Sequence, residues 1–151
     1  VDVRPTAPVD EWSGDTGCGV QYFSQQAVGR LAKKAGFQEA EHLPLPDLLE
    51  QVQAAVAGGD DKARLIFETI GTWLGYALPW YARFYDFSNV LILGRVTSGE
   101  GGNLIIRSAQ KVLETEFPEL AGNIHFITTD ETTKRHGQAV AAASLPDIPE
   151  S

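Results

Sequence analysis

Two short apolar runs separated by an amphipathic stretch constrain the fold of this chain more than any other feature. Residues 89–94 read Asn-Val-Leu-Ile-Leu-Gly, and residues 124–127 read Ile-His-Phe-Ile. Between them, apolar residues recur at helical spacing over 104–117 and stop before Pro118. A continuous apolar run of this length is typical of a strand buried on both faces of a parallel sheet. The pattern therefore predicts a β-α-β unit with a right-handed crossover.

Helical periodicity dominates the remaining sequence, so we expect an α/β fold in which helices outnumber strands. The expected helices cover 24–36, 46–57, a longer run from Asp60 or Asp61 to about Phe84, and about 131–144. Two buried strands cannot form an independent parallel sheet that is covered on both faces. The sequence therefore predicts an incomplete sheet, whose other strands come from the first 20 residues or from another part of the protein.

Capping residues and helix breakers fix several boundaries of these helices. Ser24 is placed as an N-cap and Gly36 as a left-handed C-cap. Pro79 is expected to kink or interrupt the long helix. Gly71 and Gly75 lie four residues apart on one face of it, and each costs about 1 kcal/mol of helix propensity. We therefore expect another backbone to approach this face closely.

Acidic residues outnumber basic ones, 20 to 12, which gives a net charge of −8. Nonspecific binding to DNA needs a basic surface, so we expect no DNA contact by this segment. The longest apolar runs are too short to span a bilayer. A single cysteine, Cys18, cannot make an internal disulfide and fits a reducing compartment, which predicts a cytoplasmic location.

The composition also suggests that the chain is one lobe of a longer protein. Methionine is absent even at position 1, and the chain opens with Val-Asp-Val-Arg-Pro. We expect residues 1–20 to form an arm and a glycine-rich loop, and residues 21–151 to form a single lobe.

The segment after the first predicted strand is the strongest candidate for a ligand site. It reads Gly94-Arg95-Val96-Thr97-Ser98-Gly99-Glu100-Gly101-Gly102 and precedes a predicted helix. Open α/β sheets bind ligands at this position, and the helix N-terminus offers free N–H groups to a phosphate. The segment matches neither a Walker A loop nor a dinucleotide fingerprint. The alternative is a connecting loop that uses its glycines only for turning.

A second glycine-rich loop covers residues 13–19 and includes Asp15, Gly17 and Gly19. It is a second candidate site, and the alternative is a tight turn into the first helix. Cys18 is more typical of a small buried residue than of a nucleophile, because no motif places a histidine beside it.

The remaining chemistry-bearing residues favour structural roles. The three histidines show no metal-ligand spacing, and His125 in the second strand is interpreted as a core residue. One group of aromatic residues at helical spacing is interpreted as core or as a subunit interface. It comprises Trp73, Trp80, Tyr81, Phe84 and Tyr85.

Taken together, four segments resemble the carboxyl-terminal lobe of a ROK-family protein (repressor, open reading frame, kinase). Residues 13–24 resemble the family's Cys-Gly-x-x-Gly-Cys-x-Glu segment, and residues 70–77 resemble its glycine-bearing long helix. Residues 90–98 resemble its apolar strand and glycine-rich loop, and residues 136–143 resemble its closing Gly-Ala-Ala helix. The resemblance covers essentially the whole chain and is nearest to a group of predicted sugar kinases.

The resemblance implies a helix-rich, ribonuclease H-like lobe of the actin-like ATPase superfamily. It implies phosphoryl transfer from ATP, with Mg²⁺, to a sugar hydroxyl, and a catalytic Asp located before Val1. The residues that would bind the nucleotide are Gly94, Arg95, Ser98, Gly99, Gly101 and Gly102. The loop with Asp15, Gly17 and Gly19 would lie on the substrate side. The implied partners are an amino-terminal lobe, a sugar, a nucleotide and a second copy of the chain, and this segment alone is expected to be inactive.

Three departures from the family pattern change these expectations. Glu11 and Ser13 stand where two of the family's zinc-binding cysteines would be, so we predict no zinc. Val20 replaces the family's sugar-binding Glu, and Arg95 stands where a glycine is typical.

Three functions therefore remain open. The chain is half of a sugar-kinase-like enzyme, a non-catalytic sugar- or nucleotide-binding lobe of a ROK-type regulator, or a dimerisation module. Val20 favours the regulator and the glycine segment favours the kinase. The face of Gly71 and Gly75, together with the aromatic helix, favours a dimerisation module that packs against a second copy of the chain.

Overall fold

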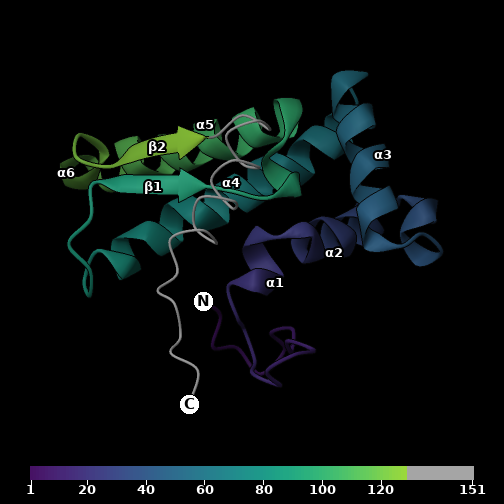
Figure 1. Cartoon of the computed structure of the whole chain (residues 1–151), viewed down its shortest axis with the longest axis horizontal. Helices are drawn as coiled ribbons and strands as arrows, with labels where there is room; N and C mark the ends of the chain where they lie inside the picture. Colours follow the sequence, from purple (N-terminus) through teal and green to yellow (C-terminus); the bar gives the residue numbers. More distant parts are fainter. Residues whose placement is uncertain (129–151) are drawn as a thin grey trace, which may run out of the picture.

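The computed structural model describes residues 1–128, and the helix predicted over 131–144 lies outside them. Figure 1 shows two strands lying against a pair of long helices, with two further helices toward the other end of the molecule. In chain order, with η marking a 3-10 helix, the elements are α1 (Val20–Phe23), α2 (Gln25–Ala35), η1 (Gln38–Glu41), α3 (Leu45–Ala57), α4 (Asp61–Tyr81), β1 (Asn89–Ile92), η2 (Arg95–Thr97), α5 (Gly99–Glu116), α6 (Pro118–Ala121) and β2 (His125–Thr128). The α/β class with a majority of helices is confirmed.

The predicted caps of α2 are confirmed by the geometry of its two ends. The Ser24 hydroxyl accepts a hydrogen bond from the N–H of Gln26 at 3.1 Å. Gly36 adopts the left-handed conformation with φ 84°, and the N–H of Phe37 donates to the carbonyl of Ala32 at 3.0 Å. This pattern satisfies a carbonyl that the end of the helix would otherwise leave unpaired.

The N-terminus of α4 is capped by a side chain, and a substitution can test this assignment. The Asp60 carboxylate accepts a hydrogen bond from the N–H of Ala63 at 2.8 Å. Asp60→Ala is therefore expected to lower the free energy of unfolding by about 1 kcal/mol in urea denaturation. Asp61→Ala changes the neighbouring carboxylate, which lies inside the first turn, and serves as the control. An equal or larger loss in the control would contradict the assignment of Asp60 as the cap.

The long helix α4 continues through Pro79 and ends two residues later at Tyr81. The expected interruption at Pro79 is therefore wrong. Proline lacks an N–H, so it costs α4 one bond to the carbonyl four residues earlier. Because Pro79 lies in the last turn, this loss falls where the helix is already ending.

The glycine face of α4 packs against α5, which confirms the expected close backbone approach. A Cβ atom on Gly71 would lie 2.2 Å from the carbonyl oxygen of Ile105, and one on Gly75 would lie 2.6 Å from Cβ of Val112. Both glycines are buried. This face is therefore not available to a second copy of the chain, because a helix of the same chain already occupies it, and dimerisation itself stays a prediction.

The two strands form a parallel pair, as the β-α-β pattern predicts. Asn89 is in register with His125, and Ile92 with Thr128. Val90 and Phe126 face a small core that includes Leu78, Leu113 and Ile124.

The opposite face of this sheet is exposed in the part of the chain that the structure describes. Leu91 is 54% exposed and Ile127 is 44% exposed. The prediction of strands buried on both faces is therefore wrong for residues 1–128, because α4 and α5 cover one face only. His125 is also exposed at the start of β2, so its interpretation as a core residue is wrong.

The main core lies where α2, α3, α4 and α5 meet. Phe67 of α4 is its largest fully buried side chain, and Leu48, Leu49 and Val52 of α3 contribute to the same cluster. Val96 of η2 belongs to this cluster as well. The core therefore fixes the segment between β1 and α5, which carries the candidate site.

Candidate functional site

The segment after β1 makes a sharp turn that depends on two glycines. Gly94 has φ 104° and Gly99 has φ 62°, conformations that side-chain-bearing residues rarely adopt. A Cβ atom on either glycine would meet no other atom within 4 Å. Both residues are exposed. This stretch of backbone can therefore be approached closely by a ligand.

Gly101 and Gly102 differ from this pair, although the sequence pattern grouped all four in one loop. They lie in the first turn of α5 and are buried. A Cβ atom on Gly101 would lie 2.7 Å from the ring of Phe67, and one on Gly102 would lie 2.0 Å from the carbonyl oxygen of Thr97. Their role in this part of the structure is close packing, so a ligand would meet the backbone at Gly94 and Gly99 instead.

The N-terminus of α5 is not capped by a side chain. Ser98 is the N-cap residue, in an extended conformation, and its side chain makes no cap hydrogen bond. The first turn of a helix has N–H groups without intrahelical partners, and the dipole of this 18-residue helix adds positive potential there. Of the residues in this turn, Gly99 and Glu100 are exposed, so their N–H groups are the ones that an acceptor from outside the helix can approach.

Side-chain hydrogen bonds hold the segment in place from two directions. The Gln53 amide of α3 donates to the carbonyl of Arg95 at 2.9 Å and to that of Ser98 at 3.4 Å. The Thr97 hydroxyl donates to the carbonyl of Gly94 at 2.7 Å. The turn is therefore preorganised, which lowers the entropic cost of binding a ligand.

The charges around the start of α5 favour an anion. Arg95 is exposed within the turn. The Glu100 carboxylate accepts from Asn103 at 2.9 Å and pairs with Arg107. These two bonds, Asn103 first, lower the pKa of Glu100. The negative charge of Glu100 is thus balanced along α5, and Arg95 contributes a cation to the turn.

The second predicted loop lies apart from this segment. Figure 1 places residues 13–19 beside α1, away from the carboxyl ends of the strands. Gly17 is buried with φ 73°, and a Cβ atom there would lie 1.8 Å from the carbonyl oxygen of Asp2. Gly19 is the N-cap of α1, and Asp15 is exposed. The conformation of Gly17 favours the alternative interpretation of the loop, a tight turn into a helix.

The residues of this loop do not fit a zinc site. Among residues 1–128, no three side chains of the His, Cys, Asp and Glu types gather closely enough to hold a metal ion. The Ser13 hydroxyl lies 3.8 Å from the sulfur of Cys18, and neither Ser13 nor Glu11 is a thiolate ligand. Hydrogen bonds close the loop instead, since Asp10 accepts from the N–H groups of Ser13 and Gly14 at 2.9 Å each.

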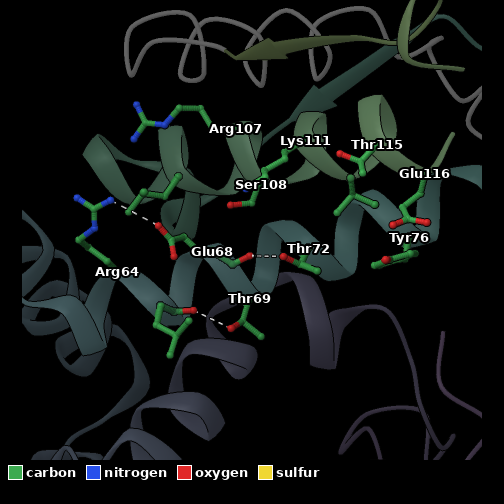
Figure 2. Close-up of a pocket in the computed structure, with 13 residues that line it drawn as sticks. Arg64, Glu68, Thr69, Thr72, Tyr76, Arg107, Ser108, Lys111, Thr115 and Glu116 are labelled. Atoms are coloured by element: carbon green, nitrogen blue, oxygen red, sulfur yellow. Dashed lines mark hydrogen bonds and ion pairs between the residues drawn. The ribbon is translucent and has the colours of Figure 1, made fainter. Parts of the chain in front are cut away.

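A groove of about 690 Å³ between α4 and α5 was not predicted from the sequence (Figure 2). The Arg64 guanidinium lies 3.5 Å from the Glu68 carboxylate, and Arg107 pairs with Glu100. The Thr72 hydroxyl donates to the backbone carbonyl of Glu68 at 2.9 Å. These groups bind each other or their own helix and do not converge on a common point. We therefore assign no ligand to this groove.

The exposed aromatic residues at the end of α4 and just after it contradict one of the two interpretations of this group, a core, and leave the other, a subunit interface, as a prediction. Trp80, Phe84 and Tyr85 are between 61% and 77% exposed, so they do not form a core in residues 1–128. Helical spacing of aromatic residues identifies a shared face but not its environment.

Comparison with protein-family models, with curated proteins and with solved structures found no match to this chain. Among the helices of residues 1–128, none combines the length and the apolar character that crossing a membrane requires. The functional argument therefore depends on the geometry of residues 94–99.

Proposed function

We propose that this chain is the nucleotide-binding lobe of an ATP-dependent, sugar-kinase-like protein. The observation that carries the proposal is the open turn formed by Gly94 and Gly99, next to an uncapped N-terminus of α5 and the exposed Arg95. A phosphate group is the ligand that this combination suits, since it accepts several N–H bonds and is attracted by the dipole and the guanidinium.

The position of the turn supports a nucleotide rather than a free anion. It follows the carboxyl end of β1, and the carboxyl end of the parallel neighbour β2 lies at the same edge of the sheet. Open α/β sheets bind nucleotides at such edges. The resemblance to the ROK family agrees with this position, and it implies that Mg²⁺ would accompany ATP. Phosphoryl transfer depends mainly on positioning and charge stabilisation, so the lobe would act together with a second lobe.

The proposal is tested by calorimetric titration of the chain with Mg·ATP and Mg·ADP. Arg95→Glu replaces an attractive charge by a repulsive one and is expected to weaken binding by about tenfold or more. Gly101 is unsuitable for this test, because a side chain there would displace the ring of Phe67.

Lys111→Glu is the matched control for that experiment. It makes the same change of charge as Arg95→Glu but on α5, 12 positions beyond Gly99, which is about 18 Å along that helix. We expect it to change the affinity by less than about twofold. Absence of binding by the unmodified chain, or equal effects of the two variants, would contradict the proposal.

A regulatory lobe is the second candidate function, and Val20 favours it. This residue lies at the first position of α1, and its side chain is exposed. Because an isopropyl group has no acceptor atom, it cannot accept a hydrogen bond from a sugar hydroxyl. Binding of Mg·ATP without phosphorylation of any sugar, when the chain is joined to its expected amino-terminal lobe, would favour the regulator over the kinase.

A further inference from the structure

A cavity of about 830 Å³ lies between the first four residues and the carboxyl-terminal end of α4. We call it the aromatic cavity, and the rings that α4 and the following turn contribute to it are Trp73, Tyr76, Trp80, Tyr81, Phe84 and Tyr85. None of residues 94–102 lines it. The cavity therefore belongs to a part of the molecule that the proposed nucleotide site does not use.

The acidic side chain in the wall of the cavity is already neutralised. The Asp2 carboxylate accepts hydrogen bonds from the Tyr22 hydroxyl at 2.5 Å and from Nε of Arg4 at 2.9 Å. The Asp2 side chain is only 9% exposed, whereas that of Arg4 is 73% exposed. A partner therefore meets the guanidinium of this pair before it meets the carboxylate.

Two further cations lie against the rings of the cavity. The Arg83 guanidinium lies 4.7 Å from the centre of the Trp80 ring, and that of Arg30 lies 5.1 Å from the centre of the Tyr22 ring. Among residues 1–128, no carboxylate forms an ion pair with Arg83. The cavity therefore has an excess of positive charge in a chain whose net charge is −8, and this excess favours an acidic partner.

Arg83 covers only part of the aromatic surface. Trp80 is 61% exposed with the Arg83 guanidinium in place over its ring, and Phe84 and Tyr85 are exposed beside it. The stacked guanidinium holds the indole ring in position, which lowers the cost of ordering it around a partner. The surface that remains can therefore receive apolar groups next to a fixed cation.

The length and chemistry of this wall suit a polyproline II segment. From Trp73 to Tyr81 the wall extends over eight residues of α4, about 12 Å. A polyproline II helix rises about 3.1 Å per residue, so four of its residues match that length. Its carbonyls have no internal hydrogen bonds and can accept from tyrosine hydroxyls and from the indole N–H, while its proline rings pack on the aromatic faces. Aromatic-lined grooves bind proline-rich segments in this way.

We propose that the aromatic cavity binds an acidic, proline-rich peptide of a partner protein. Prolines of the peptide pack on Trp80, Phe84 and Tyr85, and a carboxylate of the peptide pairs with Arg83. The proposal goes beyond the nucleotide function and concerns different residues, so either proposal can fail alone.

The test is calorimetric titration of the chain with three blocked heptapeptides at physiological ionic strength. The first is Pro-Pro-Glu-Pro-Pro-Glu-Pro, the second has Lys in place of each Glu, and the third has Gly and Ser in place of the prolines. We expect the first peptide to bind, and the other two to bind at least about tenfold more weakly. The second peptide tests the charge of the cavity, and the third tests its need for prolines.

Arg83→Glu is the decisive variant, because it reverses the one cation that lies on the Trp80 ring. It is expected to weaken binding of the Glu peptide by about tenfold and to make the Lys peptide the better ligand. A variant that was merely damaged could lose affinity for both peptides but could not gain affinity for one. Lys34→Glu makes the same change of charge outside the cavity, and we expect it to leave the preference unchanged.

Trp80→Ala tests the ring itself and is expected to weaken binding of the Glu peptide by about tenfold or more. Since Trp80 is largely exposed, its removal leaves no internal hole, and circular dichroism verifies that the variant folds. Trp12→Ala, on an exposed tryptophan outside the cavity, is expected to leave the affinity unchanged.

Four results would overturn the proposal. The first is that none of the peptides binds the parent chain, and the second is that the Glu and Lys peptides bind equally well. The third is that Arg83→Glu does not reverse the preference between them. The fourth is that sedimentation reveals a dimer that Trp80→Ala dissociates, because a second copy of the chain would then occupy the cavity.

Discussion

Phe67→Ala is expected to lower the free energy of unfolding by about 3–5 kcal/mol. The side chain of Phe67 is fully buried where α2, α3, α4 and α5 meet, and its ring fills the space next to Gly101. Replacing it removes apolar contacts and leaves a cavity that the surrounding helices can fill only in part. Domains of this size are stable by about 5–15 kcal/mol, so the variant would lose a large share of its stability.

The measurement is urea denaturation, with Phe84→Ala as the matched control. The control makes the same chemical change on a side chain that is 77% exposed, and we expect it to alter the free energy of unfolding by less than about 0.5 kcal/mol. Similar losses in both variants would mean that α4 does not present the face containing Phe67 to the core.

Local signals in the sequence were sufficient to predict most helices and their ends. The caps at Ser24 and Gly36 depend on a few neighbouring residues, so each can be predicted without knowledge of the rest of the fold. The start of α4 was narrowed to Asp60 or Asp61, and the structure identifies Asp60 as the cap. The short helix α1 was missed, because its four residues give too little periodicity to detect.

Whether a given face of a strand or helix is buried or exposed could not be predicted from the same local signals. The apolar pattern of β1 identified a strand, but it could not reveal that Leu91 would be exposed in residues 1–128. Spacing also identified the aromatic face of α4 without indicating that it borders a cavity. Burial depends on elements far away in the sequence, which a local pattern does not contain.

The candidate site was predicted in position but not in detail. Sequence reasoning located the turn after β1 correctly, since strand and helix boundaries are local features. It treated Gly94 and Gly101 alike, because a glycine that permits a positive φ and a glycine that permits close packing are the same residue in a sequence. Only the structure separates the open pair of glycines from the buried pair.

Gly71→Ala is expected to destabilise the chain, which reverses the usual effect of this substitution in a helix. Replacing an exposed glycine in a helix interior by alanine stabilises the helix by about 1 kcal/mol. At Gly71 the new Cβ would lie 2.2 Å from the carbonyl oxygen of Ile105 and 2.8 Å from its Cα. These are backbone atoms of α5, so relief requires the two helices to separate. Overpacking of this kind costs about 1–3 kcal/mol, which we expect to see as a lower midpoint in urea denaturation.

Gly122→Ala provides the control, because this residue has a helical conformation with φ −75° and no atom within 4 Å of its Cβ position. It is expected to raise the free energy of unfolding by about 0.4–1 kcal/mol, since alanine reduces the freedom of the unfolded chain. The two variants should therefore shift the midpoint in opposite directions. A stabilising effect at both positions would show that α4 and α5 are not in backbone contact at Gly71. That outcome would contradict the close packing of α4 against α5, which holds α5 in the core.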